Sequence, residues 1–223
     1  MYVFIKICIS SGGYGGGPKN TILEFSYETE TWDEIGAMKE TRSSHAVSLM
    51  SYDVFTQFYA KWCSVSDSTT DGVPSGSSVS DSTTEGTNVG SSVSDLTSVF
   101  LLTGGSNNST SSEIYNPESK TSCTLPKFLK KRSFHTQEGG LVCGGGSEDA
   151  SQKSCSKWSP TSGTWEQSHT LRQQRKEHVS WAAASGVYLI GGEFSKKTSE
   201  LAKVDGSVEE GFGLEYDTRL HFL

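Results

Sequence analysis

The chain has 223 residues, of which 33% are hydrophobic, and a net charge of −7 at pH 7. The negative charge argues against a nucleic-acid partner, because the strongest basic stretch is only PKFLKKR (126–132). No apolar run approaches the roughly 18 residues that a transmembrane helix needs, so we expect no membrane partner either.

The first 50 residues have the pattern of short strands separated by turns. The opening MYVFIKICIS (1–10) leads into a glycine pair and fits a strand better than a signal peptide, because Lys6 interrupts it and no small-residue cleavage site follows. A second strand is expected over TILEFS (21–26). The Gly-rich GGYGGG (12–17) precedes this strand rather than a helix, so it does not predict a phosphate site.

Residues 51–98 have a different composition and are interpreted as an insertion. The aromatic segment YDVFTQFYAKWC (52–63) predicts a short helix or irregular strand, and the alternative is an exposed docking segment. Residues 64–98 form 14-residue repeats of Ser, Thr, Gly and acid, for which we expect disorder because they offer little apolar surface to bury. A passive spacer is favoured over a phosphorylated segment.

From residue 99 onward the strand pattern returns. VFLLTGG (99–105), LVCGGG (141–146) and VYLIGG (187–192) are apolar runs that end in glycine pairs. Val, Ile, Leu and Tyr in such runs suit buried strands, and the glycines permit a tight turn or a positive φ. The polar links NPESK (116–120) and SPTSG (159–163) are typical of hairpin turns.

Four positions recur in three copies, with steps of 7, 10 and 3 residues. They are an aromatic residue, a second position that is Trp in two copies, an arginine and a histidine: Phe25, Trp32, Arg42 and His45; Tyr115, Ser122, Arg132 and His135; Trp158, Trp165, Arg175 and His178. A glycine pair precedes each copy, and a fourth pair follows: Gly12, Gly13; Gly104, Gly105; Gly144, Gly145; Gly191, Gly192. The alternative, a β-sandwich, has no reason to repeat this register.

This pattern resembles the kelch repeat, in which an apolar strand ends in Gly-Gly and Tyr, Trp and Arg follow. The resemblance implies an all-β fold, a partial kelch-type β-propeller with about three four-stranded blades plus a partial fourth in an open arc. The chain would divide into an incomplete first blade (1–50), the insertion (51–98), and blades two, three and a partial fourth (99–223). Ser122 departs from the motif, and the fourth copy lacks the aromatic pair.

The resemblance also implies a function, a protein–protein interaction scaffold. By motif position, Arg42, Arg132 and Arg175 would face the mouth of the channel and bind another protein, with an acidic peptide segment as the ligand that suits arginine. The alternative is that each arginine bonds carbonyl groups of the neighbouring blade. An open arc would also expose apolar ends, which predicts self-association.

Other functions are weighed against this one. A propeller of the oxidase or sugar-active type, resembling galactose oxidase, and a truncated product without its own function are the alternatives. No catalytic motif is found, so we expect neither an enzyme nor a cofactor. A metal held by the repeated histidines near the axis is a further alternative to each histidine bridging within its own blade.

The five cysteines bear on the compartment. None has CxxC spacing, which gives no support for a metal site, and Cys8 and Cys143 are expected to be buried as small hydrophobic residues. Free thiols favour the cytoplasm. Secretion is the alternative, because Asn107 and Asn108 begin two overlapping glycosylation sequons.

Overall fold

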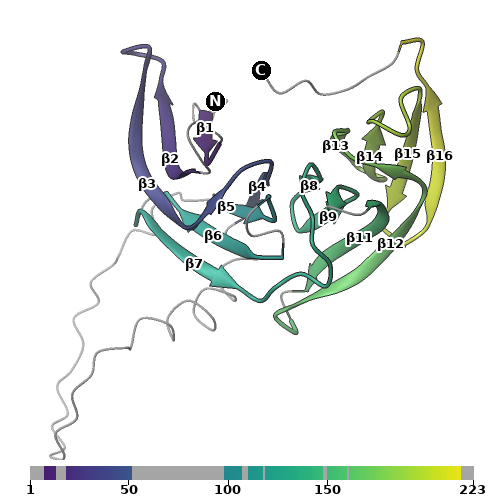
Figure 1. Ribbon diagram of the computed structural model, residues 1–223, viewed down its shortest axis with the longest axis horizontal. Coiled ribbons are helices and arrows are strands. Elements are labelled where there is room, and N and C mark those ends of the chain that lie inside the picture. Colours follow the sequence, from purple (N-terminus) through teal and green to yellow (C-terminus); the bar gives the residue numbers. More distant parts are fainter. Residues whose placement is uncertain are drawn as a thin grey trace, which may run out of the picture.

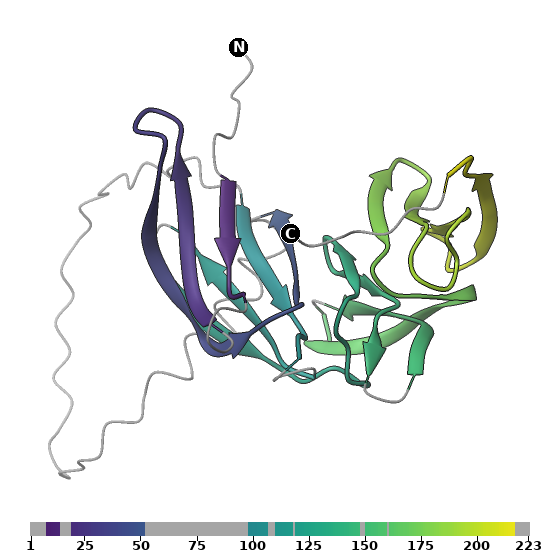
Figure 2. The same cartoon turned by 45° about the horizontal axis from the view of Figure 1, so that its top comes forward.

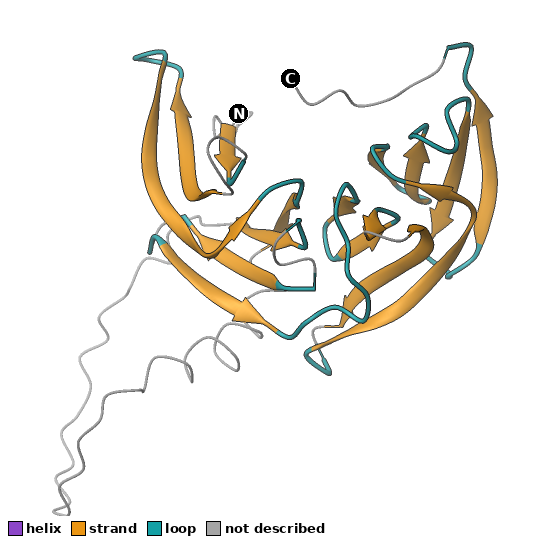
Figure 3. Ribbon diagram, in the orientation of Figure 1, coloured by secondary structure: helices purple, strands orange, loops and turns teal. Residues whose placement is uncertain are grey.

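The computed structural model describes residues 8–13, 19–51, 98–106, 110–117, 119–147, 150–159 and 161–216. The described part is all-β and contains no helix, as Figure 3 shows by its orange strands. The aromatic segment 52–63 and the acidic repeats up to residue 97 lie outside the described residues, as do Asn107 and Asn108, which begin the two sequons, and the first seven residues.

The first two sheets are antiparallel and are formed by consecutive strands. The first sheet has three strands in the order β1-β2-β3: β1 (Cys8–Ser11), β2 (Lys19–Ser26) and β3 (Thr31–Arg42). The second has four in the order β4-β5-β6-β7: β4 (Ala46–Ser51), β5 (Ser98–Thr103), β6 (Ser112–Asn116) and β7 (Thr121–Leu125). Because β4 pairs with β5, the insertion connects the first two strands of one sheet, and Ser98 already belongs to a strand.

The third and fourth sheets continue the pattern. The third contains β8 (Thr136–Glu138), β9 (Leu141–Cys143), the short β10 (Gly146–Ser147), β11 (Ala150–Ser159) and β12 (Thr164–Arg175). The fourth contains β13 (Val179–Ala183), β14 (Gly186–Ile190), β15 (Thr198–Lys203) and β16 (Val208–Gly213). The fourth sheet therefore has all four strands, so the prediction of a partial fourth unit is wrong.

The four sheets follow one another along an arc that does not close. Figure 1 shows the first sheet at one tip and the fourth at the other, and the view in Figure 2, turned by 45°, keeps the two tips apart. Each sheet places its first strand on the inner side of the arc and its last strand on the outer side. All-β structure in repeated four-stranded sheets confirms the coarse part of the fold prediction.

The seven-residue step of the repeat corresponds to a hairpin. Phe25 lies opposite Trp32, Tyr115 opposite Ser122, and Trp158 opposite Trp165 in the pairing of neighbouring strands. Side chains directly opposite each other share a face of the sheet and contact one another. The predicted hairpins over 116–120 and 159–163 are confirmed by these registers.

Each glycine pair lies where one sheet meets the next. In the second sheet, Gly104 and Gly105 have φ values of +62° and +104°, which L-residues with a side chain rarely adopt. A Cβ on Gly104 would lie 2.5 Å from the Arg132 carbonyl oxygen, and one on Gly105 would lie 2.8 Å from that of Ser43. Glycine is therefore required both by the turn and by the close approach of the neighbouring links.

Three apolar clusters fill the spaces between consecutive sheets. Ile22 and Met38 of the first sheet pack with Phe100, Leu102 and Tyr115 of the second. The second cluster joins the second and third sheets: Met50, Val99, Leu101, Ile114, Leu125, Phe128, Val142, Trp158 and Trp165. The third cluster joins the third and fourth sheets: Cys143, Cys155, Leu171 and Leu189. Each sheet is thus stabilised mainly by its neighbours.

Cys143 is buried as expected, but it is not a free thiol. It lies opposite Cys155 on the neighbouring strand, and the two form a disulfide; Cys123 is disulfide-bonded as well. Cys123, Cys143 and Cys155 are therefore not free thiols and do not support a reducing compartment. The compartment stays a prediction. In the described part of the chain, no helix of the length and apolarity needed to cross a bilayer is found.

Candidate functional site

The three repeat arginines lie where the chain passes from one sheet to the next. Arg42 and Arg175 end the last strands of the first and third sheets, and Arg132 lies in the link between β7 and β8. Their exposed fractions are 0%, 0% and 1%. Side chains this deeply buried offer nothing to a binding partner, so the partner-binding role we expected for them is withdrawn.

Arg42 reaches forward into the second sheet. Its Nη1 donates to the carbonyl oxygens of Gly104 at 2.6 Å and Ser111 at 3.2 Å, and its Nε donates to Glu113 Oε1 at 3.0 Å. The second oxygen of Glu113 accepts the backbone N–H of Lys39 at 2.7 Å. The buried ion pair is therefore held by further hydrogen bonds, which a buried charge requires.

Arg175 repeats this arrangement one interface later. Its Nη1 donates to the carbonyl oxygens of Gly191 at 2.8 Å and Thr198 at 2.9 Å. Its Nε and Nη2 both donate to Glu200 Oε1, at 3.1 and 3.0 Å. Burial lowers the pKa of Arg175, and the carboxylate of Glu200 opposes that shift. Bonding to carbonyl groups of the neighbouring sheet was the alternative for these arginines, and the structure shows it.

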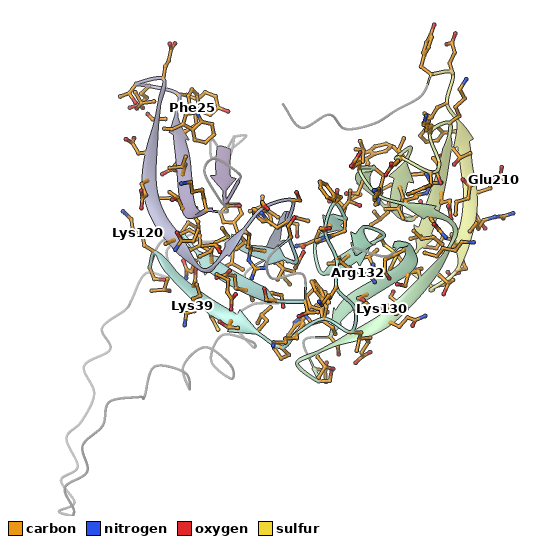
Figure 4. All side chains as sticks on the ribbon, in the orientation of Figure 1. Phe25, Lys39, Lys120, Lys130, Arg132 and Glu210 are labelled. Carbon is orange, nitrogen blue, oxygen red and sulfur yellow. A yellow bond between two sulfur atoms is a disulfide. The ribbon has the colours of Figure 1, made fainter. Side chains whose placement is uncertain are left out.

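Arg132, which is labelled in Figure 4, has no carboxylate partner among the described residues. Its guanidinium donates to the carbonyl oxygens of Gly144 at 2.6 Å and Ser154 at 2.8 Å, and to the hydroxyls of Ser154 and Ser156. Ser156 holds the repeat position that Glu113 holds in the second sheet, because each lies two residues before the repeat aromatic, Trp158 and Tyr115 respectively. Burial lowers the pKa of Arg132 to about 10, because the buried guanidinium loses its hydration.

This difference predicts that Ser156→Glu stabilises the protein. The new carboxylate would stand where Glu113 and Glu200 stand beside their arginines, and it would neutralise a buried cation. We expect the free energy of unfolding to rise by about 1–3 kcal/mol. Urea unfolding followed by circular dichroism measures this. Ser156→Gln is the matched control, and an equal effect of both substitutions would contradict the charge-based explanation.

The repeat histidines bridge backward to the preceding sheet. The Nε2 atoms of His45, His135 and His178 hydrogen-bond to hydroxyls of Ser11, Thr103 and Thr136, at 2.8, 2.9 and 2.8 Å. All three partners belong to the sheet before the strand that each histidine leads into, so each bond joins two sheets; by the predicted boundaries, Ser11 and His45 still fall in one unit (1–50). Arginines that reach forward and histidines that reach backward thus join each pair of sheets in both directions.

The tautomer of His135 follows from its neighbours. Thr103 donates its hydroxyl proton to Oε1 of Gln137, so it can only accept from His135, whose Nε2 must carry the proton. The Nδ1 atoms of His135 and His178 are buried without a hydrogen-bond partner. Burial, reinforced by the nearby arginines, lowers the pKa of His45 to about 4 and of His178 to about 3, and that of His135 well below its ordinary value. Among the described residues, no group of three or more His, Cys, Asp or Glu side chains could hold a metal.

An exposed basic segment lies in the link just before Arg132. Lys127, Lys130 and Lys131 are exposed, and the side chain of Leu129 between them is 60% exposed; Lys130 is labelled in Figure 4. Phe128 is buried and its ring centroid lies 4.2 Å from that of Trp165. Sequence reasoning used this stretch only to argue against nucleic acid, although its three lysines in five residues were a visible signal.

The comparisons add no family assignment. Neither a protein-family model nor any curated protein matches the sequence. The described geometry thus offers two kinds of feature. The arginine and histidine bridges are structural, and the basic link and the two ends of the arc are exposed.

Proposed function

We propose that the chain is a scaffold of the kelch-type β-propeller class that binds another protein. The proposal is supported by the repeated register, in which the aromatic pair falls on a hairpin and the glycine pair falls at the meeting of two sheets. It is also supported by the succession of similar sheets along one arc (Figure 1). Each sheet would correspond to one blade.

The observation that carries the binding proposal is the rigid basic link of residues 127–131. Phe128 and Arg132 anchor it, because Phe128 is buried in the cluster between the second and third sheets and Arg132 is bonded to the third. The backbone N–H of Phe128 also donates to the Thr110 carbonyl at 2.7 Å. A segment fixed on both sides loses little conformational freedom on binding, which favours affinity.

The chemistry of this link fits an acidic peptide. Lys127, Lys130 and Lys131 concentrate three positive charges within five exposed or anchored residues of a chain whose net charge is −7. Leu129 would supply an apolar contact at the centre of the lysines. The proposed ligand is still an acidic peptide, as we expected for the arginines, but the exposed lysines rather than the buried arginines would bind it.

Charge reversal tests this proposal. We expect a random peptide library presented to the whole chain to enrich sequences rich in Asp and Glu. Their binding should weaken at least about tenfold for the triple variant K127E/K130E/K131E, because attraction becomes repulsion at each position. Fluorescence anisotropy of one enriched peptide would measure the change, and raising the salt concentration should weaken wild-type binding.

A second triple variant serves as the matched control. Lys19, Lys120 and Lys157 are exposed elsewhere on the described surface, so K19E/K120E/K157E changes the net charge by the same amount. It should bind the peptide within about twofold of wild type. Enrichment of peptides without acidic residues, or equal loss in both triple variants, would count against the basic link as the binding site.

A further inference from the structure

Consecutive sheets always meet through the same two kinds of face. We call the face that carries the repeat aromatic position the backward face, because Tyr115 and Trp158 pack on the preceding sheet from it. The opposite side is the forward face, from which Leu101 of the second sheet meets Trp158 of the third. All three contacts within the chain therefore join a forward face to a backward face, and no two faces of one kind meet.

No sheet of the described residues precedes the first one, and its backward face is exposed in the described structure. Phe25 contacts Tyr27 and Trp32, with ring centroids 5.1 and 5.2 Å apart. Trp32 is 47% exposed, whereas Trp165, which holds the same repeat position inside the arc, is 3% exposed. Three aromatic rings thus stand on a face that the other sheets bury.

No sheet of the described residues follows the fourth one, and its forward face is also aromatic. Tyr188 lies between Trp181 and Phe212, with ring centroids 5.8 Å from each. Trp181 is 59% exposed and Phe212 is 47% exposed. Tyr188 stands three residues before its glycine pair, as Leu101 does, yet Leu101 is fully buried under the next sheet. The described arc thus has one exposed face of each kind, the backward face of the first sheet and the forward face of the fourth.

Gly13 in the first sheet has open space where the equivalent glycines of the other sheets contact a preceding link. In the other three sheets, a Cβ on the second glycine of the pair would lie 2.7–2.8 Å from a carbonyl oxygen of the preceding link: Gly105, Gly145 and Gly192. Gly13 keeps the positive φ of that position, at +116°, but has no described atom within 4 Å of such a Cβ. The backbone of the first sheet can therefore accommodate a preceding link at Gly13, and the described part of the chain places none there.

We propose that two copies of this chain associate head to tail. The Trp181–Tyr188–Phe212 face of one copy packs on the Phe25–Tyr27–Trp32 face of the other, which repeats between chains the contact made three times within each. The two surfaces differ, so the interface is heterologous and every copy offers one of each. This association goes beyond the binding of an acidic partner and does not depend on it.

The charges at the two faces are compatible with the contact. On the fourth sheet, Glu209 lies opposite Leu201 and is paired with Lys203, so its charge is compensated. On the first sheet, Glu34 lies opposite Leu23 and remains exposed. Burial of the predominantly aromatic surface favours the contact, whereas the one uncompensated carboxylate, Glu34, opposes it through its cost of desolvation.

Sedimentation of two variants, alone and mixed, tests the proposal. The wild-type chain should form oligomers whose mass rises with concentration. Trp32→Glu removes the backward face and Trp181→Glu the forward face, so each variant alone should be monomeric, with a dissociation constant raised at least about tenfold. An equimolar mixture should form a complex of two copies that does not grow, because each variant keeps the face that the other has lost.

The controls separate this mode from other associations. Leu49→Glu, on β4 of the second sheet, should sediment as wild type, because Leu49 is 47% exposed and lies outside both faces. Tyr27→Glu and Phe212→Glu form a second pair, to be used if either tryptophan variant lacks the wild-type circular dichroism spectrum. A monomeric wild type at millimolar concentration would overturn the proposal. So would self-association of either variant alone, since that requires contact between faces of one kind.

Discussion

Replacing Glu200 by alanine is expected to lower the free energy of unfolding by about 3–5 kcal/mol. Glu200 is 2% exposed and accepts two hydrogen bonds from Arg175 as well as the backbone N–H groups of Arg172 and Gln173. Without the carboxylate, the arginine remains buried with only carbonyl and hydroxyl partners, and two backbone donors lose their acceptors. Urea unfolding at neutral pH measures the loss.

Glu210 provides a matched control for this experiment. It lies opposite Glu200 on the neighbouring strand and approaches Arg172 at 3.8 Å, but both side chains are largely exposed. Because water screens such a pair, Glu210→Ala should change the free energy of unfolding by less than about 1 kcal/mol. Similar losses for the two alanine variants would show that the buried pair does not hold the third and fourth sheets together.

The second large effect is a loss of stability in mild acid. The three repeat histidines have pKa values below the ordinary 6.5, about 4 for His45, about 3 for His178 and well lowered for His135. Between pH 6.5 and about 4, these histidines bind protons in the unfolded chain but stay neutral in the folded chain. The free energy of unfolding is therefore unaffected by them above this window and falls as the pH is lowered through it. Each histidine should contribute a loss of up to about 2 kcal/mol between pH 7 and pH 5.

Unfolding free energies measured by urea titration at several pH values test this. His178→Gln can still hydrogen-bond Thr136 but does not titrate, so the slope of stability against pH near pH 5 should fall by about 1.4 kcal/mol per pH unit. The slope is the informative quantity, because a structural defect alone would shift the whole curve without changing it. Unchanged stability of the wild type from pH 7 to pH 5 would contradict the buried, neutral histidines.

Local structure was largely predictable from the sequence. The seven-residue step between Trp158 and Trp165 corresponds to two strands joined by a tight turn, and the structure pairs these residues directly. The glycine pairs fall at the ends of strands with positive φ, as their chemistry requires. Such features depend on neighbouring residues of the chain, which is why periodicity and residue type report them.

Contacts between sheets were decided by the tertiary structure. Arg42 could have faced solvent or the next sheet, and its long side chain is directed by acceptors 62 and 71 residues further along the chain. In the fourth sheet, Ala202 lies opposite Val208 where the other sheets have the repeat aromatic position, so the repeat pattern did not predict β16. The disulfide of Cys143 likewise depends on its register with Cys155.

The amino-acid sequence by itself thus determined the strands and turns of the three units that carry the full register, but not the last strand of the fourth sheet. Only the tertiary structure decided which sheet each arginine and histidine joins, and which aromatic faces remain exposed at Trp32 and Trp181. The physical reason is that hairpins form from residues close in sequence, whereas the burial of a face depends on whether another sheet stands beside it.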